Sequence, residues 1–164
     1  MPEYYSRIAR SYDALHSEEQ LKKAAFVKSK ISFEGRLLDI GAGTGTATET
    51  FAQNTQAVIL DPSLEMLLQC SEKKFLRVCA RAEELPFKSN SFDAVVSLTA
   101  LHHADLKKAF SEIRRVSRKN AKIAVSFFKR AKKLSQAKRV FREFQCFDEG
   151  TDLVFLKHGF SKTK

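Results

Sequence analysis

The chain has 164 residues, enough for one domain with a sizeable core and too few for two ordinary domains. Apolar residues make up 43% and are spread along the whole sequence, which excludes a disordered chain. No run of about 18 apolar residues and no apolar signal core is present, so we expect a soluble, cytoplasmic protein with no membrane partner.

The net charge of +10 is concentrated in one part of the sequence. Residues 107–142, here called the basic stretch, contain fourteen lysines and arginines and the single acid Glu112, which gives +13 there and leaves −3 elsewhere. Most charge runs are ordinary solvated surface. A shared basic face would, alternatively, attract a polyanion such as RNA.

Apolar runs of strand length alternate with longer helical segments, which predicts an α/β fold with a parallel sheet and crossover helices. Two helices are expected ahead of the sheet, at 4–12 and 17–29. The core should then follow as strand 36–40, helix 46–53, strand 57–60, helix 64–71, strands 75–79 and 92–98, helix 105–118, strand 121–128, helix 132–144 and a hairpin of 145–146 with 152–157.

Two local features complete this outline. Ser63 follows a turn and is expected to cap the helix at 64–71. The three cysteines, Cys70, Cys79 and Cys146, form no C-x-x-C pair, so we interpret them as buried reduced thiols and expect no metal site.

The segment LLDIGAGTGT, residues 37–46, contains a G-x-G-x-G turn directly after a predicted strand. Such a turn lets backbone N–H groups approach a ligand closely. A dinucleotide fold would place a third glycine where Thr46 stands. Asp39 would repel a pyrophosphate but could hold an ammonium group, and Asp61 could accept the hydroxyls of a ribose. The two acids fit a ligand with an amino acid at one end and a ribose at the other.

With these residues the sequence resembles the class I S-adenosylmethionine-dependent methyltransferases, most closely their type 11 branch. The resemblance lies in four blocks: LLDIGAGTGT at 37–46, VILDPS at 58–63, ARAEELPFKSNSFDAVVS at 80–97 and LHHADLKKAFSEIRRVSRKNAKIAVS at 101–126. It implies a Rossmann-like, seven-stranded, mostly parallel sheet with helices on both faces and a C-terminal antiparallel hairpin. It also implies one methyltransferase domain over 1–164, with a helical cap at 1–30 and the core at 31–160.

The resemblance implies that S-adenosylmethionine is the cofactor and assigns positions around it. Asp39, Gly41, Ala42 and Gly43 would surround the methionine part and Asp61 the ribose. The other implied positions are Pro62, Met66, Ala82 and Glu83 near the adenine, Ser97 and Leu98 at the end of the fourth strand, and Tyr12 closing over the cofactor. Arg81 departs from the family pattern, which frequently has an Asp there as acceptor for the adenine amino group.

The chemistry of the acceptor is less constrained. His103 could serve as a general base, or the pair His102-His103 could simply start a helix. Ser97-Leu98-Thr99-Ala100 lacks the Asn/Asp-Pro-Pro-Tyr motif of enzymes that methylate adenine or glutamine nitrogens. The short connection at 128–132 suggests an open site, which favours RNA or another macromolecule, or a partner protein that completes the site.

Three alternatives remain at this level. The chain could be a small-molecule methyltransferase of the same family, or a non-catalytic cofactor-binding module that acts through a partner protein. An NAD-dependent oxidoreductase is disfavoured by Asp39 and Thr46.

Overall fold

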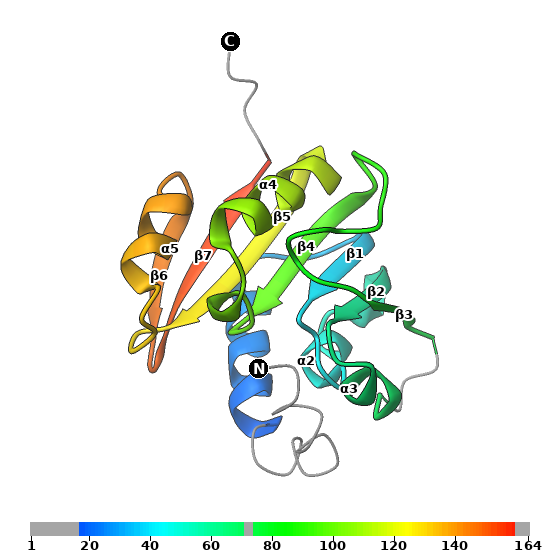
Figure 1. The fold of residues 1–164 in the computed structure, drawn as a ribbon. Coiled ribbons are helices and arrows are strands. Elements are labelled where there is room, and N and C mark those ends of the chain that lie inside the picture. Colours follow the sequence, from blue (N-terminus) through cyan, green and yellow to red (C-terminus); the bar gives the residue numbers. More distant parts are fainter. Residues whose placement is uncertain (1–16, 71–73, 160–164) are drawn as a thin grey trace.

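A computed structural model describes residues 17–70 and 74–159, so the expected helix at 4–12 and Tyr12 lie outside the described residues. The centre of the fold is a seven-stranded sheet in the order β3-β2-β1-β4-β5-β7-β6 (Figure 1). Its strands are β1 (Gly35–Ile40), β2 (Thr55–Asp61), β3 (Leu76–Cys79), β4 (Phe92–Leu98), β5 (Ser117–Phe128), β6 (Gln145–Glu149) and β7 (Asp152–His158).

The predicted α/β class and the mostly parallel sheet are confirmed. Strands β1 to β5 pair with one another in parallel, whereas β7 runs antiparallel to both β5 and β6. The C-terminal hairpin is therefore confirmed, with a first strand longer than expected.

The helices are mostly shorter than the sequence predicts. They are the N-terminal helix, described over 17–30, α2 (Thr46–Glu49), α3 (Leu64–Leu68), α4 (Leu106–Val116) and α5 (Leu134–Val140), with 3-10 turns at Ala52–Asn54 and Leu101–His103. The helix expected at 132–144 ends early because the Phe144 N–H bonds the Phe141 carbonyl three residues back, a tight turn that buries both rings.

Two apolar layers follow from the alternation of side chains along the strands. On β1, Leu38 and Ile40 belong to the core beneath α4 and α5, while Leu37 belongs to the opposite core. That second core contains residues of the N-terminal helix, α2 and α3. Helices therefore cover both faces of the sheet, as expected, and α4 and α5 share one face (Figure 1).

The glycine turn after β1 contacts the segment after β4. Gly41 has φ +72°, and a Cβ added to it would lie 2.2 Å from the Cβ of Ala100. Only glycine satisfies both the backbone conformation and the approach. This contact brings the ends of β1 and β4 together at the carboxyl edge of the parallel strands.

The cysteine interpretation is right for Cys70 and wrong for the other two. Cys70 is buried, whereas Cys79 and Cys146 are exposed. Both exposed thiols lie on the edge strands, β3 and β6, where neighbouring elements cover less of the surface. Within the described residues, no helix has the length and apolar character needed to cross a bilayer.

Candidate functional site

A cavity of about 250 Å³ lies at the carboxyl edge of the parallel strands. The segments after β1, β2, β3 and β4 line it, and Ser17 and Gln20 of the N-terminal helix contribute to its wall. It brings together most of the residues singled out in the sequence: Asp39, Gly41, Ala42, Gly43, Asp61, Pro62, Met66, Ala82, Glu83, Leu98 and His103.

Ser97 is not among the cavity-lining residues. Its side chain is fully buried and its hydroxyl donates to the Ile40 carbonyl at 2.8 Å, so it ties β4 to the end of β1. Thr99, two residues later, lines the cavity instead.

Asp61 lies at the end of β2 and fixes the glycine turn. One carboxylate oxygen accepts the Gly43 N–H at 2.9 Å and the other accepts the Ser63 N–H at 2.8 Å. Burial raises the pKa of Asp61, and these two N–H groups partly oppose the rise. Ser63 in turn caps α3 as predicted, since its hydroxyl accepts the Met66 N–H at 3.3 Å.

Asp39 is the more deeply enclosed acid, with 2% of its surface exposed. Its carboxylate accepts a hydrogen bond from the Thr48 hydroxyl at 2.6 Å. Burial, with a contribution from the nearby Asp61 charge, raises the pKa of Asp39 to about 7. Two carboxylates in one enclosed space oppose a phosphate and favour a cation, which would compensate their charge.

The segment after β3 carries Arg81, Ala82 and Glu83 into the cavity wall. The Glu83 carboxylate accepts the Asp105 N–H at 3.0 Å and an Arg81 guanidinium N–H at 3.0 Å. Although partial burial opposes ionisation, these donors keep the pKa of Glu83 below its ordinary value. The Glu83 side chain thus holds the start of α4, and Arg81 supplies no acceptor to the cavity.

His103 lines the cavity and its ring centroid lies 3.9 Å from that of His102. Burial and the charge of Lys133 lower the pKa of His103, so its imidazole is neutral near pH 7 and can accept a proton. The buried Nδ1 of His102 has no hydrogen-bond partner among the described residues. No group of three or more His, Cys, Asp or Glu side chains in that part of the chain could hold a metal ion.

A buried polar network beside the cavity was not predicted. Lys23 of the N-terminal helix, 3% exposed, lies 3.2 Å from the Asp152 carboxylate and donates to the Thr99 hydroxyl at 2.9 Å. Thr99 donates to Asp152 at 2.8 Å and has φ +56°, a strained value for a β-branched residue. The one available signal was Asp152, an acid at the start of an otherwise apolar strand.

The basic stretch borders the cavity at one point. Lys133 donates to the carbonyl of Ala104, a cavity-lining residue, at 2.7 Å. Phe127, Phe141 and Phe144 are buried and offer no stacking surface, whereas Phe128 is half-buried. The exposed basic residues of the stretch are Lys107, Lys108, Arg114, Arg118, Lys119, Arg130, Lys132, Lys138, Arg139 and Arg142.

Comparison with known proteins identifies the family. The family model for a methyltransferase domain matches residues 38–125. An uncharacterized protein of Methanocaldococcus jannaschii is 39% identical over 118 residues, which cover 70% of this chain and 46% of that protein. The chain spans about half the length of the curated relatives it matches first, between 41% and 62%.

Solved structures agree with the fold. A Methanococcus maripaludis protein described as an S-adenosyl-L-methionine-dependent methyltransferase superposes with a TM-score of 0.82 at 13% identity, covering 98% of this chain and 94% of that one. A chain from the complex of the Haloferax volcanii Trm112 methyltransferase activator with a methyltransferase has a TM-score of 0.79 at 14% identity, covering 96% and 98%. The chain therefore belongs to the methyltransferase domain family.

Proposed function

We propose that this chain transfers a methyl group from S-adenosylmethionine, bound in the described cavity, to RNA. The observation that carries the cofactor part is the position of Asp39 and Asp61 in one cavity beside the glycine turn. Asp39 would take the ammonium group and Asp61 the ribose hydroxyls. Gly41, Ala42 and Gly43 would border the amino-acid part, with Pro62, Met66 and Ala82 on the adenine side.

The cofactor supplies a methyl group already activated on a sulfonium, so the protein has to orient the acceptor and exclude water. Leu98 and Thr99 line the cavity after β4, and the Lys23–Asp152 pair holds Thr99 in place. The neutral imidazole of His103 could accept the proton that the acceptor loses.

The RNA part rests on the charge of the basic stretch. Helices α4 and α5 lie on one face of the sheet, and Lys133 connects that face to the cavity rim. Because the phenylalanines of the stretch are buried or half-buried, the exposed groups available there are cations that contact phosphates. Such contacts bind without base specificity and weaken strongly with salt.

The test is a transfer assay with tritiated S-adenosylmethionine against RNA, protein and small-molecule fractions, with label expected in RNA. Replacing both Lys107 and Lys108 by Gln should reduce the slope of log affinity against log salt by about 1.4, the value for two contacts to a single strand. The matched control, Lys28→Gln with Lys30→Gln on the opposite face, should leave the slope unchanged. Equal slopes for the two variants, or label found only in the small-molecule fraction, would contradict RNA as acceptor.

A partner protein that completes the site is the second proposal. The observation behind it is the similarity to a chain solved with a methyltransferase activator. If the chain alone binds S-adenosylmethionine but labels no fraction, and label appears after addition of a purified cellular protein, the partner proposal is supported. Transfer to RNA by the chain alone contradicts it.

A further inference from the structure

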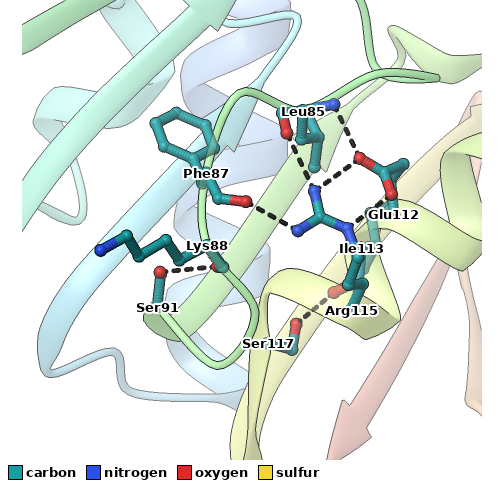
Figure 2. Close-up of polar contacts among 8 residues, drawn as sticks. All are labelled: Leu85, Phe87, Lys88, Ser91, Glu112, Ile113, Arg115 and Ser117. Atoms are coloured by element: carbon teal, nitrogen blue, oxygen red, sulfur yellow. Dashed lines mark hydrogen bonds and ion pairs between the residues drawn. The ribbon is translucent and has the colours of Figure 1, made fainter.

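The segment between β3 and β4, residues 80–91, has no regular secondary structure and yet supplies part of the cavity wall. Two residues of α4, Glu112 and Arg115, fasten it (Figure 2). We call this pair the clamp. Glu112 is the only acid of the basic stretch, and within the described residues its side chain bonds Arg115 and the Leu85 N–H of the segment.

Both residues of the clamp bond backbone groups of the segment. The Glu112 carboxylate accepts the Leu85 N–H at 2.8 Å. The Arg115 guanidinium donates to the Leu85 carbonyl at 2.9 Å and to the Phe87 carbonyl at 2.7 Å, while pairing with Glu112 at 2.7 Å (Figure 2). The planar guanidinium satisfies all these acceptors at once, and an ammonium could not.

The clamp matters because of what Ala82 offers the cavity. Ala82 is buried and lines the cavity, and within the described part of the chain no hydrogen bond involves its N–H or its carbonyl. A backbone N–H or carbonyl at the cavity wall that has no protein partner can form a hydrogen bond with a ligand. The neighbouring side chains do not take over the role of the Ala82 backbone, because Arg81 bonds Glu83 and Glu83 also bonds the Asp105 N–H at the start of α4.

The order of the strands determines which part of the cofactor reaches Ala82. With the amino acid at Asp39 after β1 and the ribose at Asp61 after β2, the base extends toward the segment after β3, the next strand outward. We infer that Glu112 and Arg115 are positioning residues that set the selectivity for adenine, by holding the Ala82 backbone where it reads the edge of the base. This inference rests on the cofactor position in the proposed function.

Adenine and hypoxanthine separate this role from a general effect on binding. The two bases have nearly the same shape and opposite donor and acceptor patterns at positions 1 and 6, so only a well-held backbone group distinguishes them. Arg115→Lys keeps the positive charge but loses the planar guanidinium that bonds several acceptors at once. Binding of S-adenosylhomocysteine should weaken about tenfold, while binding of S-inosylhomocysteine, the hypoxanthine analogue, should change less than about twofold.

The experiment is isothermal titration of both ligands to wild type, Arg115→Lys, Glu112→Gln, Lys88→Met and Asp61→Ala, with a thermal melt to confirm folding. Lys88 is an exposed cation of the same segment whose side chain takes no part in the clamp, so Lys88→Met should keep the wild-type ratio of affinities. Wild-type ratios in folded Arg115→Lys and Glu112→Gln would overturn the inference.

Asp61→Ala distinguishes failure of this inference from failure of the proposed function. If the cofactor lies as proposed, the loss of the ribose acceptor weakens both ligands equally and the ratio is unchanged. If Asp61→Ala leaves both affinities unchanged, the cofactor position itself is wrong.

Discussion

Asp39 should make cofactor binding depend on pH in a way that follows from its burial. Its pKa is raised to about 7 in the protein without ligand, and an ammonium group binds the ionised carboxylate. We consider the replacement Asp39→Asn, which keeps an oxygen acceptor for the Thr48 hydroxyl and removes the charge. The comparison ligand is S-adenosylhomocysteine, which has the ammonium group and lacks the sulfonium.

The magnitude follows from the ionised fraction of Asp39. With a pKa of about 7, roughly 1% of the carboxyl is ionised at pH 5, roughly 9% at pH 6 and roughly half at pH 7. The ligand ammonium, with a pKa of about 7.7 to 8.0, stays protonated over this range. Affinity should therefore rise about tenfold from pH 5 to pH 6 and about fivefold from pH 6 to pH 7.

The assay is isothermal titration at these three pH values, with 5′-methylthioadenosine as the matched ligand. This compound keeps the adenine and the ribose and lacks the amino acid, so it reports any effect of Asp61 without that of Asp39. The Asp39→Asn variant should bind S-adenosylhomocysteine more weakly at pH 7 and with the pH dependence of 5′-methylthioadenosine. Equal pH slopes for the two ligands in wild type would refute the assignment of Asp39 to the ammonium.

The stability of the ligand-free protein should also depend on the ionisation of Asp39, but it should fall as the pH rises, whereas the affinity for the ligand rises. Because the folded pKa of Asp39 lies above the ordinary 3.8, the folded state holds the proton more tightly than the unfolded state. Its contribution to stability is complete below about pH 4 and is lost as the pH rises toward about 7. Asp39→Asn should remove this decline, which a series of thermal melts measures.

Two further predictions concern neighbouring residues. Lys23→Met leaves the Asp152 carboxylate buried without its cationic partner, so the free energy of unfolding measured in urea should fall by about 3 to 5 kcal/mol. Lys28→Met, at an exposed position, should lower it by less than about 0.5 kcal/mol. Equal values for the two variants would mean that the pair is not needed for folding. His103→Gln should lower the rate of methyl transfer to RNA about a hundredfold with S-adenosylhomocysteine affinity retained, in single-turnover kinetics, and an unchanged rate would exclude His103 as the base.

Local signals in the sequence predicted the strands well. The run at 92–98 became β4 with the same bounds, because a continuous Val- and Phe-rich run buried on both faces has no competing helical period. The Ser63 cap was also predictable, because the cap and the amide that it bonds are only three residues apart in the sequence. Asp39 and Asp61 stand out in the sequence because each is an acid at the end of an apolar run, and both line the cavity.

Features that depend on distant contacts were not predictable. Lys23 lies in an ordinary helical pattern, and nothing local shows that Asp152 and Thr99 will enclose its ammonium. The raised pKa of Asp39 depends on enclosure by several segments. The helix expected at 132–144 is shorter because burial of Phe141 and Phe144 outweighs local helical preference.

The two exposed thiols allow a distance across the sheet to be measured with probes attached to the native chain. Cys79 and Cys146 lie on opposite edge strands, six strand spacings apart in the sheet, or about 29 Å at about 4.8 Å per strand. The Cys79 thiol also lies 3.7 Å from the carbonyl of Pro62, a cavity-lining residue, whereas Cys146 is remote from the cavity. A pair of thiol-attached probes would thus place one label beside the bound cofactor and a reference label across the sheet, with no engineered cysteine.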